Sequence, residues 1–181
     1  LPILKAFGTP NKITISQKLK SFRYNLLLRN ISYSKKLYYI GIKPHPNCRN
    51  CGKVESIKHL FWDCEVIKRF WENIRIWLGN TLNMDIKWNF EFCVLGLVKI
   101  EGTSQIKPES LTKNMSLKLI LIIICQYIHS QMCMQRSINI TECQRKIKFQ
   151  YRIEENYYIK NKNWTFHVQK WGNFINELNE V

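Results

Sequence analysis

Four residues with metal-binding side chains lie close together in the chain. Cys48, Cys51, His59 and Cys64 follow the spacing C-x2-C-x7-H-x4-C. Thiolate and imidazole are ligands that Zn²⁺ prefers, and three cysteines with one histidine fill all four tetrahedral positions. Gly52 directly follows the first pair and favours the tight turn that brings both thiolates to one ion. The pattern therefore predicts one structural Zn²⁺ ion.

Two other interpretations of these residues stay open. The four side chains can be buried without sharing an ion, and His45 offers a rival imidazole ahead of the first cysteine. We expect His45 on the surface, and we expect Arg49, Lys53 and Lys58 to help hold the nearby thiolates ionised. A short knuckle tethered by loops cannot close by packing alone, so bound metal would supply folding energy.

The remaining cysteines and histidines predict no second site. Cys93, Cys125, Cys133 and Cys143 have apolar or helical surroundings and are interpreted as buried, inert thiols. His129 and His167 fall on expected helices, where a satisfied, partly buried histidine is the ordinary case. Seven cysteines without a visible secretion signal favour a reducing, intracellular location, nuclear and cytoplasmic. The sequence starts without Met, and we expect it to be a fragment of a longer protein.

The carboxylates do not form a catalytic pattern. Phosphoryl-transfer enzymes hold divalent ions with clustered carboxylates, whereas Asp63 and Asp85 stand in separate contexts. Glu154 and Glu155 are adjacent on an expected helix, point to different faces, and are interpreted as a solvated surface pair. No glycine-rich phosphate loop is visible. The chain is therefore predicted to be non-catalytic.

An all-α fold is expected to position these residues. Apolar side chains recur at helical spacing, and capping residues mark several helix ends. His59 and Cys64 are five residues apart, which puts them on different faces of an unbroken helix, so both reach one metal only if the helix breaks near Asp63. Residues 81–110 are expected to be irregular, with a loop from Gly102 to Pro108. The expected helices span about 17–29 after Ser16, 35–40 before Gly41, 56–62 after Ser56, 65–78, 111–134, 141–158 capped by Thr141, and 164–178.

Three regions follow from this order of elements. They are a basic helical arm at 1–47, the zinc knuckle with its following helices at 48–78, and a helical body at 79–181. Helix 65–78 carries Phe70, Trp71 and Trp77, which need a buried surface. The knuckle is therefore expected to act as a clamp that fixes the arm to the body.

Positive charge concentrates before and at the knuckle. The net charge is +15, and residues 1–54 hold eleven Lys or Arg and no Asp or Glu. Such a distribution is typical of nucleic-acid binding. The residues expected to contact phosphates are Lys18, Lys20, Arg23, Arg29, Lys35, Lys36, Lys43, Arg49 and Lys53. Tyr24, Tyr33, Tyr38 or Tyr39 are candidates for stacking on unpaired bases, with a core or rim position as the alternative for each.

Two other readings of the charge were weighed against nucleic acid. A basic bias that serves only solubility explains the composition without a partner. A membrane partner is not expected, because no basic amphipathic helix stands alone. The longest apolar run, Leu117–Ile128, is interrupted by Lys118 and Gln126 and is shorter than the roughly 18–20 residues of a membrane span.

The knuckle resembles a known family. The segment CRNCGKVESIKHLFWDCEVIKRFW is similar to the zinc-binding segment downstream of the polymerase in reverse transcriptases of non-LTR (LINE-type) retrotransposons. The preceding FRYNLLLRN and KKLYYIGI resemble the helical segment before that knuckle, and YRIEENYYIKNKNWTFHVQKW resembles the C-terminal tail of vertebrate-type long interspersed elements more weakly. The resemblance implies that Cys48, Cys51, His59 and Cys64 are the zinc ligands. It also implies RNA binding during target-primed reverse transcription, with a polymerase preceding this segment.

A second class of function stays open. The knuckle and the tryptophan-rich helices can serve as a structural or interaction module that braces the polymerase or a host partner, with the basic arm merely solvated. A domesticated fragment with a new role is a third alternative. The two main hypotheses differ in whether nucleic-acid binding by the isolated chain depends on salt.

Overall fold

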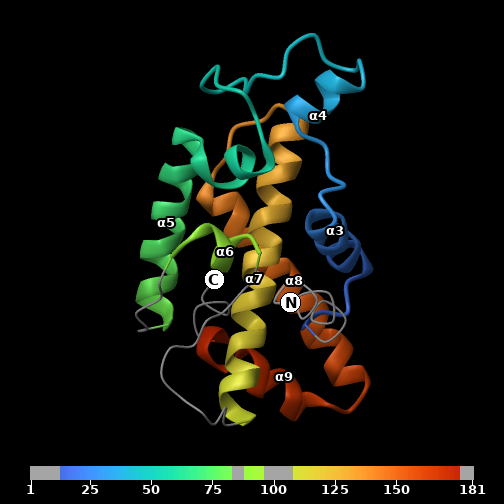
Figure 1. Ribbon diagram of the computed structural model, residues 1–181. Helices are drawn as coiled ribbons and strands as arrows, with labels where there is room; N and C mark the ends of the chain where they lie inside the picture. The colour runs from blue at the N-terminus through green and yellow to red at the C-terminus, as the bar shows by residue number, and fades with distance from the viewer. Residues whose placement is uncertain (1–12, 83–87, 96–107, 176–181) are drawn as a thin grey trace.

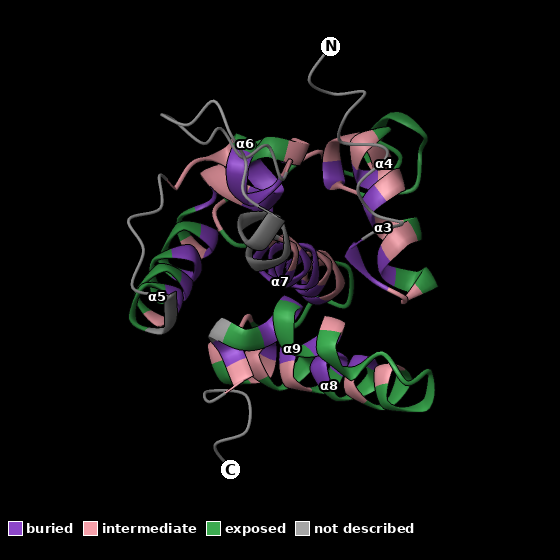
Figure 2. Ribbon diagram, turned by 90° about the horizontal axis from the view of Figure 1, so that it is seen from below, coloured by how far each residue is buried: buried purple, intermediate pink, exposed green. Residues whose placement is uncertain are grey.

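A central helix, α7 (Pro108–Cys133), organises the molecule. The computed structural model describes residues 13–82, 88–95 and 108–175. Viewed nearly along its axis, α7 is surrounded by the other helices (Figure 2). Leu119, Ile120, Ile124 and Ile128 are completely buried, and Tyr127 is nearly so. A helix that is apolar around its whole circumference needs such a surround.

The other elements follow in chain order around α7 (Figure 1). The all-α prediction is confirmed, because the described residues form helices and their only extended pairing is an isolated bridge between Asn47 and Val54. The elements are α3 (Gln17–Leu27), α4 (Ser34–Tyr39), a π-helical turn η1 (His59–Asp63), α5 (Glu65–Leu82), α6 (Phe90–Cys93), α8 (Ile140–Lys160), α9 (Trp164–Trp171) and a 3₁₀ turn η2 (Gly172–Phe174).

Several predicted helix ends are confirmed by their caps. The Ser16 side chain accepts a hydrogen bond from the Leu19 N–H at 3.4 Å and so begins α3. Gly41, with φ 74°, follows the short helix α4 in the left-handed conformation that glycine adopts at little cost. Ser56 accepts from the His59 N–H at 3.1 Å at the start of the knuckle helix.

Other predicted boundaries were wrong. Thr141 does not cap α8, because the Asn139 side chain accepts from the N–H groups of Thr141 and Glu142 at 2.8 and 3.3 Å. α5 continues through Gly79 to Leu82, and Phe90–Cys93 in the region expected to be irregular forms α6. Pro108 begins α7 rather than ending a loop, which fits the preference of proline for a first helical position. α9 ends at Trp171, and residues 176–181 of the predicted final helix lie outside the described residues.

The apolar length of α7 was also underestimated. Met115–Cys133 is long and apolar enough to cross a membrane by length and composition, yet 67% of this window is buried inside the structure. Side chains from all three predicted regions share one buried cluster with α7, among them Leu26, Phe61 and Trp171. The burial is that of a core helix. The division into arm, knuckle and body stays a prediction.

The interpretation of Glu154 as a surface residue was wrong. Its carboxylate is completely buried between α8, α9 and the residue stretch that leads into α3. It accepts hydrogen bonds from Lys170 Nζ at 2.5 Å, Thr14 Oγ1 at 2.9 Å and Trp171 Nε1 at 3.1 Å. Lys170 is also buried and donates to the Ile13 carbonyl. Glu155 does lie nearer the surface and pairs with Arg152 at 2.8 Å.

The remaining cysteines and histidines differ in their burial. Cys93, Cys125 and Cys143 are buried as predicted, and burial raises the pKa of Cys125 to about 12. Cys133, by contrast, is exposed at the end of α7, so its prediction as a buried thiol was wrong. His129 is partly buried, with Nε2 3.0 Å from the Ser32 carbonyl oxygen, as expected of a satisfied histidine.

His167 was expected to be hydrogen-bonded, and this expectation was wrong. It is completely buried, and neither ring nitrogen has a hydrogen-bond partner among the described residues. Its ring lies 5.0 Å from that of Tyr151 and stacks on Trp164 at 5.1 Å, centroid to centroid. Burial, and to a smaller extent Lys170, lower the pKa of His167, while Glu155 and Glu154 oppose this.

Replacing His167 by Phe is expected to remove part of the acid sensitivity of the fold. Because the pKa of His167 is lowered from 6.5 in the folded state, the unfolded chain binds the proton more readily below that pH. The wild type then loses stability through this residue as pH falls below about 6.5, at most about 1.4 kcal/mol per pH unit. Urea unfolding at pH 7.5 and 5.5 measures the change. Protonation of the zinc ligands affects both proteins alike, and His45→Gln on the surface should behave as wild type. An equal pH dependence of H167F and wild type would contradict the assignment.

Candidate metal centre

The residues 47–54 form a small turn that presents two thiols. The Cys48 N–H donates to the Lys53 carbonyl at 2.7 Å, and the Gly52 N–H donates to the Cys48 carbonyl at 2.8 Å. Gly52 has φ 73°, a left-handed conformation in which a side chain would be strained. The bridge between Asn47 and Val54 closes the base of the turn. Cys48 and Cys51 are therefore held on one side of a preformed loop.

The other two candidate ligands sit at the ends of the π-helical turn η1. The Cys64 N–H donates to the His59 carbonyl at 3.2 Å, a bond between residues five apart. Cys64 itself is extended, with ψ 134°, and α5 begins at the next residue. The predicted break near Asp63 is confirmed, and it takes the form of a widened turn. Residues five apart, which an α-helix would separate, thus share one side.

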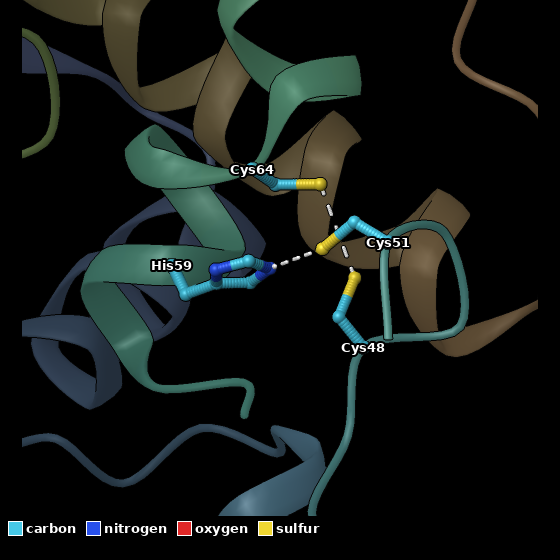
Figure 3. A group of neighbouring side chains, drawn as sticks. All are labelled: Cys48, Cys51, His59 and Cys64. Atoms are coloured by element: carbon cyan, nitrogen blue, oxygen red, sulfur yellow. Dashed lines mark hydrogen bonds between the residues drawn. The ribbon is translucent and has the colours of Figure 1, made fainter. Parts of the chain in front are cut away.

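The four side chains converge on one point (Figure 3). Their ligand atoms all lie within 4.8 Å of one another. The Cys48 and Cys64 sulfurs are 3.9 Å apart, and Cys51 Sγ lies 3.3 Å from His59 Nε2. Tetrahedral zinc with Zn–S bonds of about 2.3 Å and Zn–N bonds of about 2.0–2.1 Å places two sulfurs about 3.8 Å apart and a sulfur and a nitrogen about 3.6 Å apart. The donor set and its spacing fit Zn²⁺, and the predicted ligand set is brought together.

The surroundings of the site are largely dry. Cys48, His59 and Cys64 are buried, whereas Cys51 is only half-buried. Burial raises the pKa of Cys48 to about 12, with backbone hydrogen bonds from Asn50 and Cys51 in opposition. Without a metal this thiol stays protonated at neutral pH. Zn²⁺ must therefore displace its proton, and the metal's charge then compensates for the buried thiolate.

The π turn connects the site to the core. Trp71 on α5 donates its indole N–H to the Phe61 carbonyl at 2.7 Å, within the turn where backbone bonding is irregular. The Phe61 ring stacks on His129 of α7 at 6.4 Å between centroids, and Phe22 of α3 contacts the same histidine ring at 5.8 Å. The side chain of Asn50 reaches Met132 Sδ at 3.4 Å. The knuckle thus joins the end of α7 to both α3 and α5.

A buried carboxylate, which sequence reasoning missed, joins α4 to the knuckle. Glu55 accepts hydrogen bonds from the Ser34 N–H at 2.6 Å and from Ser34 Oγ at 2.7 Å. Lys43 Nζ lies 3.0 Å from the same hydroxyl, and the Lys35 N–H donates to the Glu55 carbonyl at 3.3 Å. The prediction placed Glu55 at the start of the following helix. Its pairing with the first residue of α4 is a contact across 21 positions that no local pattern reveals.

Most predicted phosphate contacts lie at the surface. Lys18, Arg29, Lys43, Arg49 and Lys53 are exposed, and Lys20, Lys35 and Lys36 are half-buried. The structure brings Lys35, Lys36, Lys43, Arg49 and Lys53 together around α4 and the knuckle, and we call this group the basic apex (Figure 1). Lys18 and Lys20 lie on the separate helix α3.

Arg23 does not belong with these residues, and its assignment to phosphate binding was wrong. Only 4% of the residue is exposed. Its guanidinium donates hydrogen bonds to the carbonyls of Val94 and Leu95, just after α6. Burial lowers the pKa of Arg23. Arg23 therefore joins α3 to the segment after α6, because its planar group reaches two successive carbonyls.

Residues 10–71 match the family described as zinc-binding in reverse transcriptase. The match covers about a third of the 181 residues and includes all four candidate ligands as well as α3 and α4. This family is a zinc-binding region rather than a polymerase domain. The prediction of a Zn²⁺ cofactor is confirmed by the match together with the converging ligands.

Proposed function

From the premise that residues 10–71 are a zinc-binding segment of the reverse-transcriptase type, we propose that this chain is a nucleic-acid-binding, non-catalytic part of such an enzyme. The parent is a reverse transcriptase of the non-LTR, LINE-type retrotransposons. The nucleic acid is the element's RNA, bound during target-primed reverse transcription. The polymerase portion of the parent and the RNA are the partners, in an intracellular, nuclear and cytoplasmic location.

The observation that supports this proposal most directly is the uncompensated charge of the basic apex. None of Lys35, Lys36, Lys43, Arg49 and Lys53 forms an ion pair with a described residue. Residues 13–54 contain no carboxylate side chain, and that of Glu55, which comes next, is buried against Ser34. Zinc and the buried carboxylate fix the loops that carry the charges. A polyanion that contacts this apex would release counterions and bind in a salt-dependent way.

Reversing three charges of the apex is expected to abolish most RNA affinity. The variant is K35E/K36E/R49E, and the readout is fluorescence anisotropy with a single-stranded RNA at 50 and 200 mM salt. Five phosphate contacts predict a wild-type loss of about 100-fold in affinity across that range, since the slope is about 0.7 per contact. The variant should bind about 100-fold more weakly at low salt and depend less on salt.

The matched control is R145E/K160E/K162E, which reverses three exposed charges on α8 and the turn after it. It has the same net charge as the apex variant and should bind as wild type. If both triple variants lose affinity equally, the apex is not the binding surface.

The bracing hypothesis has its own support in the contacts of the knuckle. Phe61, Asn50 and Glu55 connect the zinc segment to α7 and α4, which is what a brace requires. In that case RNA binding would be weak and would not change with the apex substitutions. The same salt titration therefore separates the two functions.

A further inference from the structure

The basic apex also carries large apolar side chains that face solvent. Tyr39 is 73% exposed, Ile42 67% and Ile40 59%, and Tyr38 and Val54 are about half exposed. They stand on α4, on the turn after it and on the last residue of the zinc loop. We call these five residues the apolar tip. Clusters of this kind on a soluble surface mark binding sites more often than chance exposure.

The apolar tip is held in place by backbone bonds rather than by burial. The Ile42 and Lys43 N–H groups both donate to the Leu37 carbonyl, at 2.8 and 3.2 Å, through the turn at Gly41. The bridge between Asn47 and Val54 holds the zinc loop, and the Glu55–Ser34 hydrogen bonds hold α4 beside it. The side chains are thus presented on a preformed backbone, which lowers the entropic cost of binding.

Cations lie among these side chains. Lys35 Nζ is 5.9 Å from the centre of the Tyr39 ring, and the rings of Tyr38 and Tyr39 are 5.9 Å apart with an interplanar angle of 56°. Lys43 follows Ile42, and Lys53 precedes Val54. A ligand that covers the tip must therefore offer negative charge and flat or apolar faces at the same spacing.

We propose that the apolar tip binds unpaired bases of a single-stranded nucleic acid, with Tyr39 and Tyr38 stacking on bases while the neighbouring lysines contact phosphates. This rests on the proposed function in taking nucleic acid as the partner. A duplex hides the faces of its bases and presents phosphates, so it would set Ile40 and Ile42 against charged groups. A single strand offers both base faces and phosphates. The apex therefore selects single strands over duplexes.

The test compares one strand, alone and annealed to its complement, on wild type and on Y38L/Y39L. Leucine keeps apolar area and helix propensity at these exposed positions but removes the ring. Loss of stacking is expected to weaken single-strand binding about 10-fold or more per ring. Duplex binding and the slope against salt should not change, because the lysines remain. A fluorescent base analogue in the strand should be quenched by wild type and not by Y38L/Y39L.

The control is Tyr157→Leu, which removes a ring of α8 that is as exposed as Tyr38, at 44%. It should leave binding and quenching unchanged. Equal binding of strand and duplex, with no effect of Y38L/Y39L, would overturn the stacking site while the basic apex could still bind through charge. Absence of any salt-dependent binding would instead overturn the proposed function. Tip-dependent binding to phosphatidylserine vesicles without binding to the strand would overturn the stacking site in favour of a lipid surface.

Discussion

Replacing Cys64 by Ser is expected to lower the thermal midpoint by about 10–20 °C and to reduce the zinc content below one ion per chain. Structural zinc contributes about 10–16 kcal/mol of apparent binding free energy in small zinc peptides. The core around α7 does not depend on the metal, so we expect about 5 kcal/mol of the fold's stability to be lost. For a chain of this size, each kcal/mol shifts the midpoint by about 2–4 °C.

The loss should concentrate in the knuckle and its neighbours. Without zinc, the buried Cys48 and His59 lose their shared partner, and the π turn that places His59 and Phe61 is no longer held at both ends. Hydrogen exchange should show the amides of 47–64 opening, while those of α7 stay protected. A metal chelator added to the wild type should reproduce the same pattern.

Cys133→Ser is the matched control, since it removes a thiol that is exposed and outside the site. It should keep one zinc per chain and the wild-type midpoint. If Cys64→Ser and Cys133→Ser melt together, and a chelator changes nothing, zinc does not stabilise this fold.

The second large effect is expected at Glu154. Substituting Glu154→Gln leaves the Lys170 ammonium buried without its counter-charge, and breaking a buried pair in this way costs about 3–5 kcal/mol. The midpoint should fall by about 6–20 °C. Because Thr14 and Trp171 share the same carboxylate, their packing should loosen as well. Thermal denaturation and near-UV circular dichroism of the tryptophans measure these changes.

Arg152→Met is the control for this experiment. It breaks the ion pair with Glu155 on the same helix, but Arg152 is half exposed, so the cost should stay below about 1 kcal/mol. The double variant E154Q/K170M removes both charges and should recover part of the loss. A loss in E154Q no larger than that in R152M would mean that the buried pair does not stabilise the fold.

These two sites differ in how far the sequence predicts them. The zinc ligands follow a local spacing, and that spacing even required the break at Asp63 that the π turn supplies. Glu154 has no such signal, because its partners Thr14 and Lys170 lie 140 and 16 positions away. On the sequence alone, two adjacent glutamates resemble any solvated pair, and only the packing of α9 against α8 decides which one is buried.

Arg23 shows the same limit from the opposite side. Its basic neighbours in a stretch without carboxylates suggested a phosphate contact, since charge density is a property of the sequence. The residue instead lies on the face of α3 that turns toward the carbonyls of Val94 and Leu95. Helical spacing with Leu19 and Leu26 places Arg23 on their buried face, which is the one local signal that could have separated it from Lys18 and Lys20.

The uneven burial of the four zinc ligands has a consequence for the lifetime of the bound metal. Affinity depends on all four ligands, but a competing chelator or an oxidant must first reach one of them from solvent. Cys51 is the half-buried member of the set, and the other three are closed in by the π turn and the zinc loop. Metal exchange and thiol oxidation should therefore both begin at Cys51. The four residues together set the equilibrium, whereas this single sulfur sets the rate at which the site is lost.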